Sequence, residues 1–154
     1  MKAVLQRVKY ASVSVDGEVI GECREGLLIL LGVAEGDAEE DACLLCAKIL
    51  KLRIFCDENG KMNLSLLDIG GELLIVSQFT LLADYRHGNR PDFLASAKPS
   101  EAKRLYEYFI SLAKESVKNV GTGSFGADMQ VSLLNDGPVT IVMDSKMLGK
   151  GKAQ

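Results

Sequence analysis

The chain has 154 residues, of which 47% are hydrophobic and 25% charged, with a formal net charge of -3. This balance is typical of an ordinary folded domain and excludes a largely disordered chain. It also excludes a protein coated in positive charge, although it allows a local basic patch. We expect a single domain over residues 1–154.

No apolar run approaches the length of a membrane span, and the opening residues MKAVLQRVKYASV alternate in polarity and carry charge, unlike a signal peptide. We therefore expect a cytoplasmic protein with no membrane partner. In that compartment cysteines are reduced thiols rather than a disulfide framework. This expectation covers Cys23, Cys43, Cys46 and Cys56.

The first part of the chain is predicted to form strands. Residues 2–8, 10–15 and 18–23 are short runs rich in Val and Ile, and Asp16-Gly17 joins the last two in a two-residue hairpin. Residues 27–34, LLILLGVA, are continuously apolar. Such a run predicts a central strand that is buried on both faces.

Two main helices are expected. Asp37, with Glu40 three residues later, has the form of an N-cap, and residues 38–52 have helical length and spacing. The second helix begins near Pro99 and continues to residue 117, with apolar residues at strict three-four spacing. Cys43 and Cys46 lie among apolar residues of the first helix, so we interpret them as core residues and expect no metal or cofactor.

The remaining segments complete the fold. Residues 71–81, GELLIVSQFTL, predict another largely buried strand, and residues 128–134 and 139–144 alternate as strands. Residues 82–93, LADYRHGNRPDF, have no periodicity and predict a loop of possible functional importance. The order of elements predicts an α+β fold with a mostly antiparallel sheet, barrel-like or in two sheets.

The hexapeptide NDGPVT, residues 135–140, allows two interpretations. Asp-Gly between alternating runs favours a β-hairpin, yet Pro138 has no N–H to close a turn centred on Asp136 and Gly137. A hairpin centred on Asn135 and Asp136 avoids this problem. Alternatively, the Gly-Pro unit is useful in itself, because it leaves two carbonyl groups on a rigid and nearly bare backbone.

Three further motifs contain residue types that could bind a ligand or catalyse a reaction. GTGSFG, residues 121–126, has the letters of a dinucleotide-binding loop, but a helix precedes it and a strand follows, the reverse of the required context. His87, the only histidine, lies in an irregular segment that is either a positively charged binding loop or a plain solvated one. Ser77, Gln78 and Thr80 interrupt an apolar strand, either as structural hydrogen-bonding groups or as part of an oxyanion hole.

Taken together, the motifs SQFTL (77–81), GNRP (88–91), FGADM (125–129) and NDGPVT (135–140) resemble the D-aminoacyl-tRNA deacylase family, and KMNLS (61–65) strengthens the likeness. The resemblance spans essentially the whole chain. It implies a hydrolase that cleaves the ester of D-aminoacyl-tRNA, spares the L-aminoacyl ester, and also acts on glycyl-tRNA mischarged on tRNA(Ala).

The same resemblance implies a homodimer with its active sites at the subunit interface. Gly137-Pro138 of one chain, joined by a cis peptide bond, would reach the partner's active site. The site residues that it would face are Ser77, Gln78, Phe79 and Thr80 as catalytic residues, with Phe125 and Met129 bracing the pocket. Arg7 would hold the Gly-Pro loop in place.

Two mechanisms are compatible with these residues. Thr80 could attack the ester, although no base is evident beside it. Otherwise water attacks while the backbone N–H groups of Phe79 and Thr80 stabilise the oxyanion, with help from the ribose 2′-hydroxyl of the tRNA. We favour the second. The tRNA contacts would come from a local patch drawn from Lys48, Lys51, Arg53, Arg86, Arg90, Lys146, Lys150 and Lys152.

Two other functions compete with this interpretation. A non-catalytic RNA-binding module would present Phe79 or Phe125 for base stacking, but the low aromatic content and negative charge count against it. A nucleotide-dependent oxidoreductase is disfavoured by the reversed context of GTGSFG.

Overall fold

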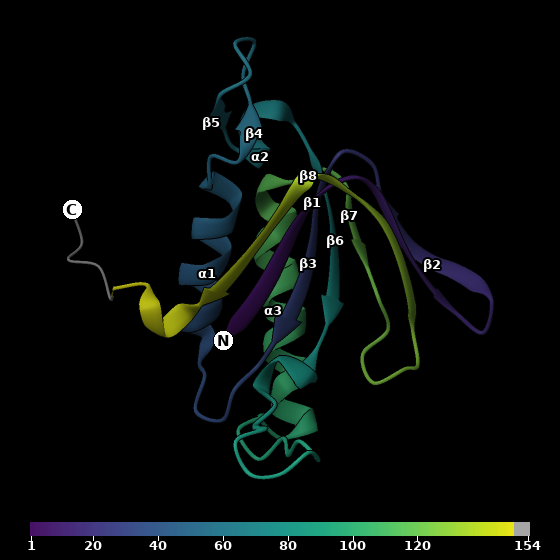
Figure 1. Ribbon diagram of the computed structural model, residues 1–154, viewed down its shortest axis with the longest axis vertical. Helices are drawn as coiled ribbons and strands as arrows, with labels where there is room; N and C mark the ends of the chain where they lie inside the picture. Colours follow the sequence, from purple (N-terminus) through teal and green to yellow (C-terminus); the bar gives the residue numbers. More distant parts are fainter. Residues whose placement is uncertain (150–154) are drawn as a thin grey trace.

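A six-stranded mixed sheet forms the centre of the computed structural model, which describes residues 1–149 (Figure 1). The strands follow the order β2-β1-β3-β6-β7, and β8 also pairs with β1. A small two-stranded hairpin, β4-β5, stands apart. Lys150 and Lys152, two members of the expected tRNA patch, lie outside the described residues. The strands are β1 (Lys2–Val15), β2 (Glu18–Cys23), β3 (Gly26–Gly32), β4 (Phe55–Cys56), β5 (Met62–Leu64), β6 (Glu72–Ser77), β7 (Val120–Thr122) and β8 (Gln130–Asp144).

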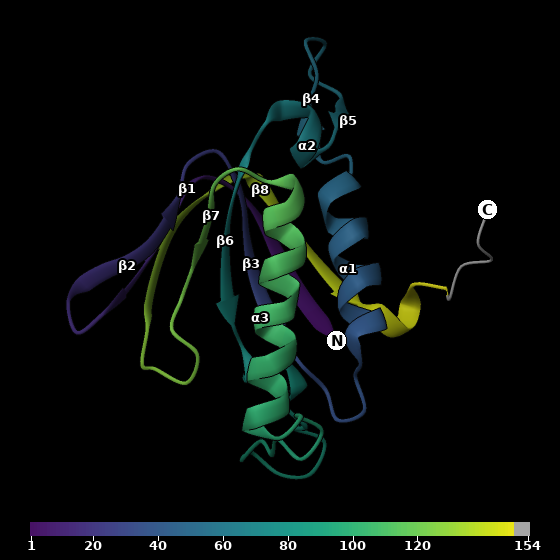
Figure 2. The same ribbon diagram turned by 180° about the vertical axis from the view of Figure 1, so that it is seen from behind.

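Helices cover one face of this sheet. The two long ones, α1 (Glu39–Lys51) and α3 (Pro99–Ser116), lie side by side against it, as the view from behind shows (Figure 2). A short helix, α2 (Leu66–Ile69), and two 3-10 turns, η1 (Phe79–Leu82) and η2 (Ser145–Met147), complete the elements. Within residues 1–149, no helix combines the length and apolar character that a membrane span needs.

The predicted α+β class is confirmed, and the pairing of the strands adds detail. β1 is antiparallel to β2, β3 and β8, whereas β6 is parallel to β3 and β7. Crossovers through α1 and α3 make these parallel pairings possible. Parallel strands buried on both faces read as continuous apolar runs, which explains the sequences of β3 and β6.

The core has two parts, one on each face of the sheet. On the helical face, α1 and α3 pack with fully buried residues of β1, β3 and β6, including Leu5, Ile29 and Ile75. On the other face, β2 and the first half of β8 cover a smaller cluster that includes Val8, Leu28 and Leu74. The sheet therefore curls over itself.

This curling brings the outer strands β2 and β7 together at two glycines. A Cβ atom on Gly21 would lie 2.3 Å from the carbonyl oxygen of Thr122, and one on Gly121 would lie 2.5 Å from that of Glu22. No side chain fits at either position. The close backbone approach explains the barrel-like appearance of the sheet.

The helices begin and end close to the predicted limits, but the predicted N-cap of α1 is wrong. The cap is Ala38, whose N–H donates to the carboxylate of Asp41 at 2.9 Å. Asp37 instead accepts from the N–H of Ala34 and lies 2.7 Å from the buried ammonium group of Met1. The carboxylate of Asp37 therefore belongs to a buried ion pair and does not cap the N-terminus of α1.

The hexapeptide NDGPVT is not a turn between two strands, so both hairpin interpretations are wrong. Strand β8 runs through it in one direction and pairs with β1 on both sides. From Val8 to Gln6, β1 advances by two residues, while β8 advances by five, from Asn135 to Thr140. The surplus residues bulge out of the sheet around Gly137-Pro138.

Candidate active site

A small cavity of about 220 Å³ lies where β6 ends. Its lining includes Val76, Ser77, Gln78 and Phe79 from the end of β6 and the start of η1, together with Phe125 and Met129 from the loop before β8. The structure thus brings together five of the residues that the sequence motifs single out. Those motifs are nearly fifty residues apart in the chain.

The backbone changes direction within the motif SQFT. Gln78 still continues the strand pairing, since its N–H donates to the carbonyl of Leu31 at 2.8 Å. Phe79 then begins the 3-10 turn η1. The first N–H groups of a helical turn have no acceptor inside the turn, so Phe79 and Thr80 have backbone donors to offer beside the cavity.

Thr80 is exposed and does not line the cavity itself. Its hydroxyl accepts a hydrogen bond from the side-chain amide of Gln78. An amide N–H donates and takes no proton, so this contact cannot activate the hydroxyl as a nucleophile. In the described part of the chain, no acidic or basic side chain pairs with Thr80.

The aromatic residues of the cavity are braced from behind. Phe79 is 57% exposed and packs edge-on against Phe93, with ring centroids 4.9 Å apart. The ring of Phe125 lies 5.9 Å from that of Tyr106 on α3, whose hydroxyl donates to the carbonyl of Ile75 at 2.8 Å. Burial raises the pKa of Tyr106 to about 12, so its hydroxyl stays protonated at physiological pH. In the sequence, Tyr106 resembles any other core residue on the apolar face of the helix, so no local signal marks its role at the cavity.

The Gly137-Pro138 bulge is held by the side chains of Arg7 and Asn135. Arg7, only 9% exposed, donates from Nε to the carbonyl of Asp136 at 2.9 Å and from Nη1 to that of Ile54 at 2.7 Å. Asn135 spans the bulge: its Oδ1 accepts from the N–H of Val139 at 2.8 Å, and its Nδ2 donates to the Thr140 hydroxyl at 3.0 Å. The peptide bond between Gly137 and Pro138 is cis. Asn135 thus ties the two ends of the bulge together, and, like Tyr106, it is not among the site residues expected from the sequence.

A partly exposed lysine adds charge beside the bulge. Lys9 Nζ lies 3.3 Å from the carboxylate of Asp136 and 3.5 Å from that of Glu25. The hydrogen bond to Asp136 and the charge of Glu25 raise the pKa of Lys9. The bulge is therefore anchored by a buried guanidinium and flanked by a solvated ion pair.

Within one chain, the bulge and the cavity do not meet. In the strand register, Arg7 on β1 lies opposite Leu27 on β3, and Leu27 lies opposite Leu73 on β6. Leu73 precedes Ser77 by four residues. Standard strand rise and spacing then put the bulge roughly 20 Å from the cavity. Gly137 and Pro138 are thus separated from the other residues that the resemblance assigns to the site.

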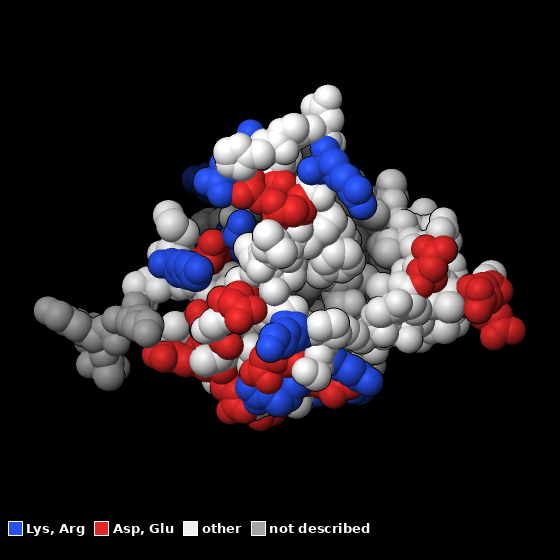
Figure 3. All heavy atoms as spheres, turned by 90° about the horizontal axis from the view of Figure 1, so that it is seen from below, with Lys and Arg blue, Asp and Glu red and all other residues white. Residues whose placement is uncertain are grey.

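The long loop between η1 and α3 is the segment for which the sequence allows either a positively charged binding loop or a plain solvated one. The guanidinium of Arg86 is bound to the carboxylate of Asp84, which lowers the pKa of Asp84 to about 2. His87 and Arg90 are exposed. Acidic and basic side chains are interspersed over the end of the molecule seen from below, so this end does not present a uniformly positive surface (Figure 3).

The cysteines and other potential metal ligands are dispersed. Cys23, Cys43, Cys46 and Cys56 are free thiols, and burial raises the pKa values of Cys23 and Cys46 to about 11. The interpretation of Cys46 as a core residue is confirmed, whereas that of Cys43 is wrong, because Cys43 is exposed. Within residues 1–149, no three His, Cys, Asp or Glu side chains are grouped so that they could hold a metal ion.

Comparisons with known proteins give a consistent family assignment. The family model described as D-Tyr-tRNA(Tyr) deacylase matches residues 4–144. The chain is 60% identical to a D-aminoacyl-tRNA deacylase of Thermosipho africanus (strain TCF52B), over 95% of this chain and 98% of that protein. It is 58% identical to a D-aminoacyl-tRNA deacylase of Dehalococcoides mccartyi (strain CBDB1), over 95% of each chain.

Two solved structures share the fold of this chain. The chain superposes on the c-Myc DNA Unwinding Element Binding Protein with a TM-score of 0.89 at 41% identity, covering 94% of this chain and 98% of the other. A probable eukaryotic D-amino acid tRNA deacylase shares the fold at 16% identity, with a TM-score of 0.80 and coverage of 92% and 97%. The chain belongs to the D-Tyr-tRNA(Tyr) deacylase family.

Proposed function

We propose that this protein is a D-aminoacyl-tRNA deacylase, which hydrolyses the ester between a D-amino acid and the 3′ end of tRNA. The observation that carries the proposal is the cavity of about 220 Å³ at the end of β6, where Ser77, Gln78 and Phe79 meet Phe125 and Met129. Its volume suits a single aminoacyl group rather than a nucleotide. Family membership independently supports the same activity.

The protein acts as a homodimer with one site at each end of the subunit interface. The separation between the Gly-Pro bulge and the cavity supports this arrangement, because a second copy related by a two-fold axis can put each bulge into the other's cavity. One domain over residues 1–154 and a cytoplasmic location, both expected from the sequence, stay predictions.

An exposed apolar row on the sheet supports the same dimer. Val142, Val4, Leu30 and Val76 are paired in register across β8, β1, β3 and β6, on the face opposite the helices. Val142 is 77% exposed, whereas Val76 is buried at the edge of the cavity. The row therefore leads from an exposed strand to the active site, where a partner subunit would cover it.

In the proposed reaction, water attacks the ester carbonyl carbon. The backbone N–H groups of Phe79 and Thr80 donate to the oxyanion that develops on the carbonyl oxygen. The bond to the ribose 3′ oxygen then breaks, and the proton lost by water reaches that oxygen with help from the neighbouring 2′-hydroxyl. Thr80 positions the substrate, in keeping with its only side-chain partner among the described residues, the Gln78 amide.

Chirality is enforced by the backbone of the partner's bulge. The carbonyl groups of Gly137 and Pro138 accept hydrogen bonds from the substrate ammonium, while η1 fixes the ester. Of the two remaining substituents of the α-carbon, one faces solvent and the other faces the wall, where only hydrogen fits. An L side chain is excluded by contact with the wall, and the glycyl ester, including glycyl-tRNA mischarged on tRNA(Ala), is accepted.

The direct experiment follows amino-acid release from D-tyrosyl-tRNA, L-tyrosyl-tRNA and glycyl-tRNA with the purified protein. We expect release from the D-tyrosyl and glycyl esters at rates well above spontaneous hydrolysis, and no acceleration for the L-ester. Retention of all three tRNAs without release would instead indicate the RNA-binding module that the sequence leaves as an alternative. Equal release of both tyrosyl esters would contradict the model of chirality.

A further inference from the structure

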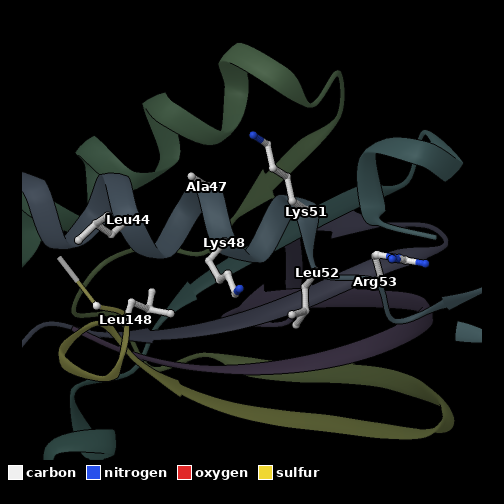
Figure 4. Close-up of a pocket in the computed structure, with 8 residues that line it drawn as sticks. Leu44, Ala47, Lys48, Lys51, Leu52, Arg53 and Leu148 are labelled. Carbon is white, nitrogen blue, oxygen red and sulfur yellow. The ribbon is translucent and has the colours of Figure 1, made fainter. Parts of the chain in front are cut away.

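A second concavity, of about 710 Å³, lies along the C-terminal half of α1 (Figure 4). Three cations line it: Lys48 and Lys51 from the last turn of α1, and Arg53 just after the helix. Leu44, Leu52 and Leu148 form its apolar part. No acidic residue belongs to the lining among the residues that the structure describes. We refer to this feature as the basic groove.

Among the described residues, the two lysines of the basic groove have no acidic partner, whereas Arg53 has an acidic neighbour: the pKa of Asp68, which is lowered mainly by hydrogen bonds with Ser65, is lowered further by the charge of Arg53. Within residues 1–149, neither Lys48 nor Lys51 forms an ion pair, whereas Lys103 and Arg104 on the neighbouring helix both do. Arg53 donates to the backbone carbonyl of Asn63 at 2.8 Å and to its side-chain oxygen at 2.9 Å, and both partners are uncharged. Figure 4 shows Lys48, Lys51 and Arg53 leaving the end of α1 in different directions.

The basic groove adjoins the segment that holds the Gly-Pro bulge. Ile54, the residue after Arg53, offers its carbonyl to Arg7 Nη1 at 2.7 Å, and Arg7 Nε donates to the carbonyl of Asp136 at 2.9 Å. A single guanidinium thus links the rim of the groove to the residue before Gly137. Both features lie on the same end of the molecule, where α1 ends and β8 bends (Figure 1).

We propose that the basic groove of one subunit binds backbone phosphates near the 3′ end of a tRNA whose aminoacyl group occupies the partner subunit's cavity. This inference rests on the proposed function, in which the Gly-Pro bulge enters that cavity. The RNA strand that leads away from the cavity must then pass the subunit that supplies the bulge. An array of cations beside an apolar floor suits a charged backbone with ribose and base edges.

The test compares two substrates with the same D-tyrosyl ester on a terminal adenosine, of which only one carries the phosphate backbone of a tRNA: D-tyrosyl-tRNA and the 3′ D-tyrosyl ester of adenosine. The variant is Lys48→Gln/Lys51→Gln, which leaves Arg53 and its bonds to Asn63 intact. The control, Lys103→Gln/Lys118→Gln, removes the same charge at positions outside the groove. We expect the variant to lower the ratio of kcat/KM for the tRNA ester to that for the adenosine ester roughly tenfold at low salt, and to reduce the salt slope of kcat/KM by about 1 to 2.

Lysines in the last turn also stabilise a helix C-terminus, so a structural role must give a different result. If loss of helix stability caused the effect, both esters would be affected alike and the ratio would stay unchanged, which would overturn the inference. An equal fall of the ratio in the control would overturn it too. Lys48→Arg/Lys51→Arg should restore the ratio. Failure of the unaltered protein to hydrolyse either ester is the distinct result that would reject the proposed function itself.

Discussion

The guanidinium of Arg7 on β1 and the carbonyl oxygen of Asp136 on β8 lie 2.9 Å apart, at the point where β8 leaves the sheet. The same side chain donates to the carbonyl of Ile54, in the segment between α1 and β4. Arg7 therefore holds together three segments that are distant in sequence. Lysine cannot reproduce this geometry, because its ammonium is a compact group without the planar fork.

Arg7→Lys should lower the free energy of unfolding by roughly 1–3 kcal/mol, since it leaves a carbonyl without its donor. It should also reduce the ratio of D- to L-ester hydrolysis, because the bulge loses its anchor. Urea unfolding and kcat/KM for both esters measure the two effects. Lys9→Gln is the matched control: it removes half-exposed ion pairs with Asp136 and Glu25 and should leave the free energy of unfolding nearly unchanged. Unchanged stability and selectivity in Arg7→Lys would contradict the anchoring role.

Gly137→Ala should reduce activity through a steric conflict. A Cβ atom at this position would lie 3.0 Å from Arg7 Nη2 and 2.9 Å from Val139 Cγ2, and Gly137 has φ at +137°. Gly17→Ala is a suitable comparison, because Gly17 also has positive φ, at +81°, but nothing lies within 4 Å. We expect both variants to lose stability, by roughly 1 kcal/mol for Gly17→Ala. Only Gly137→Ala should also lose activity in the protein that remains folded. Equal kinetic constants in the two folded variants would disprove this.

The dimer predicts complementation between two inactive chains. Gly137→Ala impairs the bulge, and Ala127→Trp fills the cavity that Ala127 helps to line. A mixed dimer has one site built from an intact cavity and an intact bulge. After denaturation and joint refolding, random association should restore about one quarter of the normal activity. If each chain carries its own complete site, the mixture will be as inactive as its components.

Thr80→Val separates the two mechanisms, since it removes the hydroxyl at nearly constant volume. If Thr80 positions the substrate, kcat/KM should fall by no more than about tenfold, which corresponds to one hydrogen bond. Loss of a nucleophile would cost roughly 10⁴-fold or more. Single-turnover assays with D-tyrosyl-tRNA measure the difference, and an acyl group trapped on Thr80 of the unaltered protein would refute the water mechanism.

Tyr106→Phe should make stability less sensitive to alkaline pH. Burial raises the pKa of Tyr106 to about 12, above the value of about 10 in an unfolded chain. The contribution of the protonated Tyr106 hydroxyl to the free energy of unfolding is therefore complete below pH 10. It is lost as the pH rises through 12, by an amount on the order of 2 kcal/mol. Unfolding free energies between pH 9 and 12 should fall more steeply for the unaltered protein than for the variant. Parallel curves would show that Tyr106 is not the group responsible.

Much of this molecule could be predicted from local pattern. The apolar spacing of α3 and the continuous apolar runs of β3 and β6 reflect burial directly. The residues around the cavity could be named because short motifs, such as SQFT, carried a specific family resemblance. Local chemistry pointed to Ser77, Gln78 and Thr80 as polar interruptions of an apolar strand, but it left both a structural role and a catalytic role open.

What the sequence did not reveal depends on contacts between distant residues. The path of β8 through NDGPVT is set by pairing with β1 on both sides, and this long-range pairing overrides the local preference for a turn. Asp37 was assigned to the end of a helix, but it binds the Met1 ammonium instead. Tyr106 gains its role only once Ile75, which is distant in the sequence, lies beside it.

The glycines at positions 21 and 121 have a consequence for how the protein behaves among other polypeptides. Free strand edges invite other chains to add to a sheet, and natural β proteins protect them. Because no side chain separates β2 from β7, each backbone shields the other from incoming strands. Larger residues at positions 21 and 121 would push β2 and β7 apart and leave the edges of both strands unprotected. We therefore expect such variants to aggregate even where the active site is intact.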